Sequence, residues 1–208
     1  MNILDTNFQN VNDYQFPLKL SFKVTTLAND FVVKDANDTT ISYVKQKLFK
    51  FVEEVTVYSN ESKTNVLYKI NANKWIDFSA TYVFTNNMGA EVGRVARKGW
   101  KSIWKARYEI YDEHQKQDLL IEEDNAWTKV FDTLFSEIPI LGIFTGYIFN
   151  PSYSVKRPDG TVVAQLKKLP GFLGRNFNIE KVAEFETGEE ERIVLSIMMM
   201  ILLERRRG

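Results

Sequence analysis

Six basic side chains gather in the middle of the chain, in a stretch that contains no acidic residue. The stretch runs from Val92 to Tyr108, and Trp100 and Trp104 are interspersed among the cations. Cations beside Trp suit a phosphate-bearing surface, because charge attracts the anion while indole lies at a membrane interface or stacks on a base. The candidate lipid- or anion-binding residues are Arg94, Arg97, Lys98, Lys101, Lys105 and Arg107.

A purely structural explanation of this stretch stays open beside the functional one. The stretch also fits a solvated strand–loop–strand whose Trp rings point into the protein interior. Successive residues of a strand face opposite sides, so Arg94 and Val95 cannot both face outward. The acidic run from Glu109 to Asp124 follows directly and can neutralise the cations.

The acidic segment from Asp112 to Asp124 is the second candidate for chemistry. Its carboxylates lack the D-x-[DN]-x-[DN]-G spacing of a calcium loop. We therefore expect no metal site here, but a solvated loop that leads into the N-terminus of a helix. His114 lies between Glu113 and Gln115, which favours a surface histidine over a catalytic base.

The composition argues against the common forms of catalysis. The chain has no Cys and one His, so thiolate metal sites and Cys nucleophiles are excluded, and no G-x-S-x-G motif is present. We expect no enzyme, no catalytic residue, no metal and no cofactor. The 27 Lys and Arg residues equal the 27 Asp and Glu residues. This balance argues against general polyanion binding, so no nucleic acid partner is expected.

Two apolar segments are too short to cross a bilayer as helices. They are Ile138–Phe149 and Ile193–Leu203, whereas a spanning helix needs about 20 residues. With no signal peptide at the N-terminus, we expect a cytoplasmic protein that is at most peripheral to a membrane. The region Ile138–Tyr153 fits a buried strand that joins two halves of the fold, or alternatively a loop that dips into a membrane or grips a partner.

Alternating apolar runs separated by turn residues predict a series of β-hairpins. Four similar units are visible, with matching apolar positions at Val44, Ile70, Val95 and Leu166. The first three recur every 25 or 26 residues, and the interval to Leu166 corresponds to about three more units. The units are Phe31–Lys47, Val55–Ile70, Thr81–Lys98 and Tyr153–Lys168.

Two segments follow a helical pattern instead. Ala126–Glu137 predicts a short amphipathic helix that lies on the sheet. At the C-terminus, Thr187 and Glu190 form a capping-box pattern, and Arg205–Arg207 suit the negative end of a helix dipole. Between these ends the residues from Ile193 to Leu203 leave no polar face, so this helix must be enclosed on all sides. A sheet curled into a closed barrel around the helix meets that need and removes free strand edges.

The chain resembles the tubby-like barrels, and among them the LURP-one-related and phospholipid-scramblase-like families, as a bacterial-type member. The resemblance rests on FVVKDANDTTISYVKQKLFKF (31–51), EVGRVARKGW (91–100) with KARYEIYD (105–112), NPSYSVKRPDGTVVAQLKK (150–168) and IVLSIMMMILLERRR (193–207). It implies an all-β fold: a closed antiparallel barrel of roughly twelve strands around an apolar C-terminal α-helix. We expect a flexible segment over residues 1–15 and a single barrel domain over 16–208.

The resemblance implies a fold more firmly than a function. Scramblases carry palmitoylated cysteines and a calcium-binding segment, and this chain has neither pattern. Tubby proteins hold phosphoinositide headgroups with basic residues, which the resemblance does not identify here. We therefore expect a non-enzymatic binding or scaffold domain that recognises anionic, phosphoinositide-like headgroups at the basic stretch. The alternative is a protein-interaction or stress-associated structural module without lipid binding.

Overall fold

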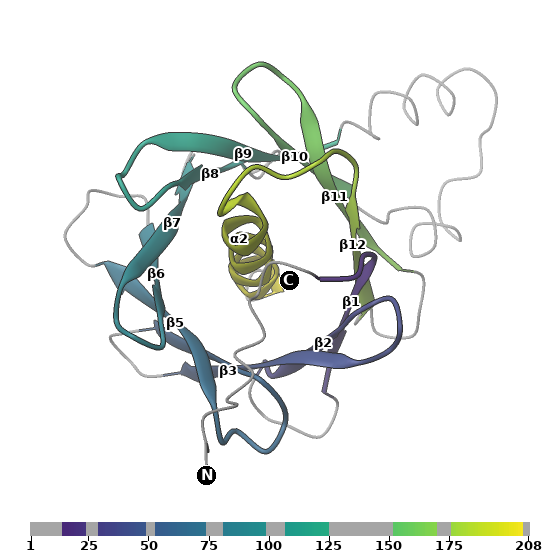
Figure 1. The fold of residues 1–208 in the computed structure, drawn as a ribbon, viewed down its shortest axis with the longest axis vertical. Helices are drawn as coiled ribbons and strands as arrows, with labels where there is room; N and C mark the ends of the chain where they lie inside the picture. Colours follow the sequence, from purple (N-terminus) through teal and green to yellow (C-terminus); the bar gives the residue numbers. More distant parts are fainter. Residues whose placement is uncertain are drawn as a thin grey trace, which may run out of the picture.

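The computed structural model describes residues 14–23, 29–48, 53–73, 81–98, 107–124, 152–169 and 176–205. Within these ranges twelve strands form one closed antiparallel barrel, and one helix lies inside it (Figure 1). The first six strands are β1 (Leu18–Phe22), β2 (Phe31–Lys34), β3 (Thr40–Leu48), β4 (Glu53–Tyr58), β5 (Val66–Asn73) and β6 (Thr81–Asn86). The others are β7 (Glu91–Lys98), β8 (Arg107–Tyr111), β9 (Gln117–Glu123), β10 (Ser152–Lys156), β11 (Val162–Lys168) and β12 (Asn176–Lys181), and the helix is α2 (Glu189–Arg205).

The ring closes between its first and last strands. Each strand pairs with its neighbours in sequence, and β1 pairs both with β2 and with β12. Leu18 lies opposite Ile179 across the closing pair, and Leu20 lies opposite Phe177. Closure leaves no strand of the ring with an unpaired edge, which confirms the predicted barrel.

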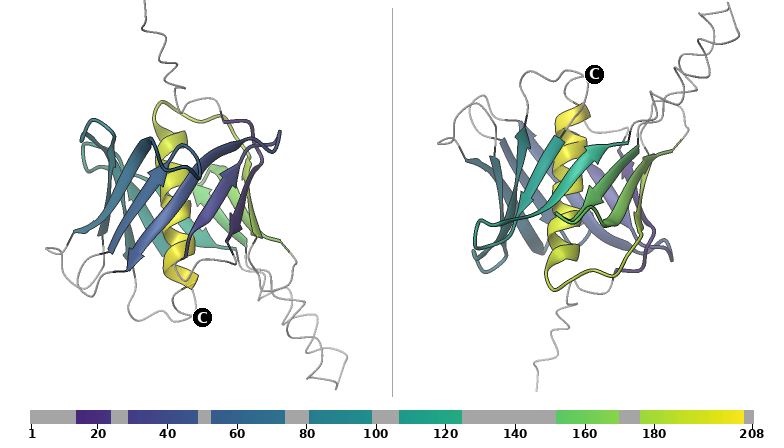
Figure 2. Two further views of the ribbon diagram at one scale, coloured as in Figure 1. Left: turned by 90° about the horizontal axis from the view of Figure 1, so that it is seen from below. Right: turned by 90° about the horizontal axis from the view of Figure 1, so that it is seen from above.

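The C-terminal helix occupies the centre of this ring and runs along its axis (Figure 2). Every residue from Ile193 to Leu202 is buried, and Ser196, the one polar member, is 0% exposed. The 17 residues of α2 span about 26 Å at the α-helical rise. The prediction that this all-apolar helix is enclosed by the chain's own strands is therefore confirmed.

The predicted hairpins correspond to β2–β3, β4–β5, β6–β7 and β10–β11. Their matching positions Val44, Ile70, Val95 and Leu166 are all at most 1% exposed, which places them in the barrel interior. These four side chains lie at equivalent points of β3, β5, β7 and β11 and pack in one core with α2.

A fifth hairpin, β8–β9, occupies the acidic segment. The prediction of a solvated loop and helix start over Asp112–Asp124 was wrong for Gln117–Glu123, which forms β9. Leu119 and Ile121 face the interior between Asp118 and Glu122, and both are at most 1% exposed. Ile121 is the counterpart of Val95 one hairpin later, so Leu166 lies two hairpins beyond Val95 and not three.

Three of the five hairpin turns share one design. The side-chain Oδ1 of Asp35, Asn86 and Asp112 accepts the backbone N–H groups two and four residues later, at 2.8–3.0 Å. In these Asx turns the residue three positions after the Asp or Asn reverses the chain. It has a left-handed backbone, with φ of 62° at Asp38 and 82° at Gly89.

Next to each turn the strand pairing shifts by one residue, which makes a β-bulge. The bulge leaves one residue of the second strand without a cross-strand partner. The five bulge residues are Ile41, Leu67, Val92, Asp118 and Val163.

Several predictions fall on segments outside the described residues. These are the amphipathic helix over Ala126–Glu137, residues 138–151 of the region Ile138–Tyr153, and Arg206 and Arg207. The division into a flexible segment 1–15 and a barrel domain 16–208 also stays a prediction. Tyr14 and Gln15 are described, and the carbonyl of Gln15 accepts the N–H of Ala36 at 2.8 Å.

Candidate functional site

The barrel has two openings that differ in their polar groups. We call the end where α2 begins the N-terminal opening, and the hairpin turns, including that of β10–β11 at Arg157, lie at this end. The end where α2 finishes is the C-terminal opening, which is lined by the last residues of β7 and the first of β8. The predicted basic residues belong to the C-terminal opening and the adjacent outer face.

Lys98 and Arg107 lie together on the outer face at the C-terminal opening. They are direct cross-strand partners at the end of β7 and the start of β8. Their side chains are 46% and 51% exposed. Lys98 Nζ lies 3.5 Å from Glu109 Oε2, and Arg107 Nε lies 3.9 Å from Glu122 Oε1.

Arg94 also faces outward, but it lies about 13 Å along β7 from Lys98 at the usual strand rise. Its guanidinium donates two hydrogen bonds to Glu91 Oε1, at 2.9 and 2.6 Å, and its side chain is 12% exposed. Arg94 is thus held flat against its own strand.

Arg97 faces the opposite way, toward the end of α2. Its Nε lies 3.7 Å from Glu204 Oε1, and its guanidinium lies 5.9 Å from the centre of the Tyr108 ring. Tyr108 donates a hydrogen bond from its hydroxyl to Glu204. Burial, reinforced by the Glu204 charge, raises the pKa of Tyr108, so this hydroxyl stays protonated. Arg205 completes this end of the helix by stacking 4.1 Å from the Phe22 ring centre.

The six basic candidates therefore do not share one face. Lys98 and Arg107 are neighbours on the outer face, Arg94 is remote from them, and Arg97 points into the barrel. Lys101, Lys105 and both Trp residues lie in the segment 99–106, outside the described residues. Binding of an anion by any of the six stays a prediction.

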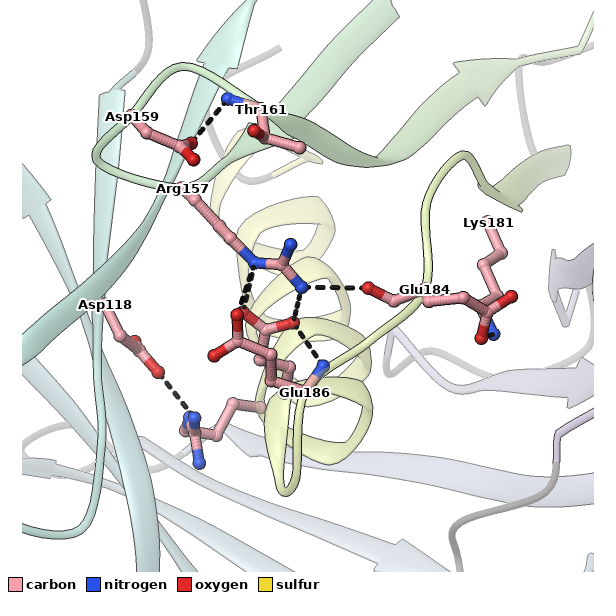
Figure 3. A network of polar contacts seen from close by, with 9 residues as sticks. Asp118, Arg157, Asp159, Thr161, Lys181, Glu184 and Glu186 are labelled. Carbon is pink, nitrogen blue, oxygen red and sulfur yellow. Dashed lines mark hydrogen bonds and ion pairs between the residues drawn. The ribbon is translucent and has the colours of Figure 1, made fainter.

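The N-terminal opening holds a denser network of polar contacts, which involves none of the six predicted basic residues (Figure 3). Arg157, in the turn after β10, donates to both carboxylate oxygens of Glu189, at 2.9 and 2.7 Å. It also donates to the backbone carbonyl of Glu184 at 2.8 Å. Burial raises the pKa of Glu189, but the hydrogen bonds from Arg157 and the backbone of Glu186 outweigh it, and the net pKa is lowered.

A second pair ties the next turn of α2 to β9. Arg192 donates to Asp118 Oδ2 at 2.5 Å, and its other terminal nitrogen lies 3.5 Å from Glu113. The side chain of Arg192 is 9% exposed. Gly93 makes room for its stem, because a Cβ at Gly93 would lie 2.7 Å from Arg192 Cδ.

The start of α2 differs from the predicted capping box. Glu189, and not Glu190, reaches back along the chain, and its Oε2 accepts the N–H of Glu186 at 2.8 Å. Glu190 Oε1 instead accepts the N–H of Tyr14 at 3.1 Å. Gly188, with φ of 77°, turns the chain directly before the helix. The carboxylate that reaches back therefore belongs to Glu189, one residue earlier than predicted.

The hairpin repeat itself contained the signal for this network. At the bulge position, Ile41, Leu67, Val92 and Val163 are apolar, and Asp118 is the exception. At the turn position, Arg157 takes the place held by Asp35, Asn86 and Asp112, since its N–H bonds the carbonyl four residues later in the same way. Both exceptional residues pair with the first turns of α2: Arg157 with Glu189, and Asp118 with Arg192.

The described residues contain neither a cluster suited to a metal ion nor a helix suited to crossing a membrane. No group of three or more His, Cys, Asp or Glu side chains in these ranges is placed to hold a metal ion. Within the same ranges, no helix has the length and hydropathy needed to cross a bilayer. His114, with a side chain that is 83% exposed, lies on the surface as predicted.

Comparison with known proteins identifies the fold family. No curated protein matches the chain significantly. The model of the LURP-one-related family matches residues 40–201. This range begins at β3 and ends within α2, so it contains every strand of the five hairpins apart from β2. The closed twelve-stranded barrel agrees with the tubby-like superfamily that includes this family. The chain therefore belongs to the LURP-one-related family.

Proposed function

We propose that the protein is a non-enzymatic binding domain that docks on anionic membrane surfaces at its C-terminal opening. The ligand class is phosphoinositide-like headgroups, and the protein would be cytoplasmic and peripheral to the membrane. Lys98 and Arg107 are the described members of the docking surface. Lys101 and Lys105, in the segment between them, are its expected partners.

The observation that carries the proposal is the direct cross-strand pairing of Lys98 with Arg107, both about half exposed. Like charges directly opposite each other destabilise a sheet, so this arrangement has a cost that an anion would relieve. Their carboxylate partners lie at 3.5 and 3.9 Å on an exposed face. Exposed ion pairs of this kind contribute about 0–1 kcal/mol, so a phosphate group can replace them.

Arg94 and Arg97 take no direct part in the proposed surface. Arg94 is bound to Glu91 through two hydrogen bonds, and Arg97 faces Glu204 inside the opening. This reduces the six sequence candidates to four.

Vesicle sedimentation tests the proposal. Phosphatidylcholine vesicles with and without a phosphoinositide would be compared for the wild type and for the double variant Lys98→Gln with Arg107→Gln. Each cation near an anionic surface contributes about 1 kcal/mol, so the double variant should bind about 30-fold more weakly. Added salt should weaken wild-type binding, because it screens exposed charges.

Lys19→Gln is the matched control. Lys19 is also exposed (41%) and ion-paired, with Asp38 at 2.8 Å, but Asp38 belongs to the β2–β3 turn at the N-terminal opening, the end opposite the proposed surface. It should leave vesicle binding unchanged. Absence of wild-type binding at low salt, or equal loss in the control, would refute the proposal.

A protein-interaction module without lipid binding is the second candidate. The observation in its favour is that each of the four described cations has a carboxylate within 4 Å. Such a mixed surface suits a protein partner of mixed charge. A stoichiometric partner recovered with the wild type, together with no vesicle binding, would favour this candidate.

A further inference from the structure

In the interior of the barrel a buried serine hydroxyl borders a small cavity near the N-terminal opening, opposite the proposed docking surface. Ser42, on β3, is 1% exposed, and its Oγ has no hydrogen-bond partner among the described residues. The cavity next to it is also lined by Tyr14, Tyr68 and Glu191. Its apolar wall includes Val57 and Met198.

The cavity arises from residue sizes at one position of the hairpin repeat. The counterparts of Ser42 on β5, β7, β9 and β11 are Tyr68, Gly93, Leu119 and Ala164. The space left at Gly93 is filled by the stem of Arg192. The space left by the short side chain of Ser42 remains, and it has room for about one water molecule.

The polar groups around this space match the needs of a water molecule. A buried water typically makes about three hydrogen bonds. Ser42 offers a hydroxyl that both donates and accepts, and the Tyr68 hydroxyl and the Glu191 carboxyl, which bond each other, offer further lone pairs. An apolar cavity of similar size would stay dry, but three polar groups converge on this one.

We propose that this cavity is a specific binding site for a single structural water, held by Ser42, Tyr68 and Glu191 beneath the side chain of Tyr14. The water satisfies the buried Ser42 hydroxyl, which has no other hydrogen-bond partner within the ranges that the structure describes. It connects β3, β5 and the first turn of α2. Tyr14, whose N–H bonds Glu190, covers it from the side of the opening.

High-resolution crystal structures of the wild type, Ser42→Ala and Ser196→Ala test the site. The wild type should show a water within hydrogen-bonding distance of Ser42 Oγ and of Tyr68 or Glu191. Ser42→Ala keeps the space but removes one partner, so the occupancy of the water should fall. Ser196 is another buried serine whose hydroxyl has no described partner, but it does not line the cavity. Ser196→Ala should therefore leave the water in place.

Xenon pressurisation of the same crystals gives an independent readout, because xenon occupies dry apolar cavities. No xenon should enter this site in the wild type. Xenon bound there, no density for a water in the wild type, or unchanged occupancy in Ser42→Ala would each overturn the proposal.

Discussion

The two ends of α2 are fixed by ion pairs of very different character. At the N-terminal opening, Arg157 and Arg192 are 19% and 9% exposed and bond Glu189 and Asp118 at 2.5–2.9 Å. On the outer face at the C-terminal opening, Lys98 and Arg107 are about half exposed, and their carboxylate partners lie at 3.5–3.9 Å. Buried pairs with hydrogen bonds hold a geometry, whereas exposed and distant pairs leave the cations available to other anions.

This difference indicates a division of tasks within one barrel. The N-terminal opening positions the helix through residues that break the hairpin repeat. The C-terminal opening holds the helix end with Arg97, Tyr108 and Glu204, and leaves Lys98 and Arg107 outside. Substitutions test that division, beginning with one in the centre of α2, which is held at both openings.

The largest effect is expected for Met199→Asp. Met199 is 0% exposed at the centre of α2, so the variant places an unpaired charge in an apolar interior. We expect a loss of at least about 4 kcal/mol in the free energy of unfolding, which would abolish folding of a marginally stable domain. Denaturant unfolding monitored by circular dichroism measures it. Met88→Asp is the control, since Met88 is 84% exposed, and unchanged melting of Met199→Asp would mean that the helix is not enclosed.

Asp118→Ile should produce the next largest loss. Ile restores the apolar residue type found at the other four bulge positions. Among the described residues it leaves the buried Arg192 with one ion-pair partner, Glu113 at 3.5 Å. We expect a loss of about 3 kcal/mol. Adding Arg192→Met to Asp118→Ile should recover most of it, because the uncompensated charge is then gone. Wild-type stability of the single variant would show that the pair does not hold α2.

Two glutamates in the first turn of α2 should show opposite pH dependence. Burial raises the pKa of Glu191 in the folded state, so the folded protein favours its protonated form and loses stability as pH rises above the ordinary Glu range. Glu191→Gln should therefore increase stability at pH 7 and have little effect in acid. The pKa of Glu189 is lowered in the folded state, so its ionised form stabilises the folded protein at neutral pH. This stabilisation is lost as the pH falls through the lowered pKa.

Glu189→Gln should accordingly decrease stability at pH 7. Unfolding curves of both variants from pH 3 to pH 8 provide the comparison. The same sign of change at pH 7 in the two variants would contradict the assignment.

The smallest effects are expected at the C-terminal opening. Arg97→Gln should cost about 1–2 kcal/mol, because it removes the charge beside Glu204 and the packing on Tyr108. Lys98→Gln should stay within about 0.5 kcal/mol, as expected for an exposed pair. Thermal melting of both variants measures the difference. Equal losses of stability in the two variants would mean that the inward Arg97 and the outward Lys98 contribute equally to the fold.

The sequence predicted the fold to the level of individual hairpins where apolar alternation was strong. β2–β3, β4–β5, β6–β7 and β10–β11 were visible because Asn, Asp and Gly turns separated them. β8–β9 was missed because its acidic outward residues hid Leu119 and Ile121. The strands β1 and β12 close the ring, but no sequence pattern near either strand indicates that they pair with each other.

The functional candidates were less predictable than the fold. Adjacent cations in sequence alternate between the two faces of a strand, so Arg97 and Lys98 point in opposite directions. The pairing of Arg157 with Glu189, and of Asp118 with Arg192, joins residues that lie 32 and 74 positions apart. The hairpin repeat marks Asp118 and Arg157 as exceptions, but no local pattern shows which residues of α2 they meet.

The sequence alone determined that a helix without a polar face must be enclosed, because exposed apolar surface is costly in water. It also determined where the chain reverses in four of the five described hairpins, since turn conformations depend on a few neighbouring residues. Only the tertiary structure decided which charges meet across the openings and which buried hydroxyl borders the cavity beside Tyr68 and Glu191. Those outcomes depend on strand register and on the rotation of α2 within the barrel, which are set by all the contacts at once.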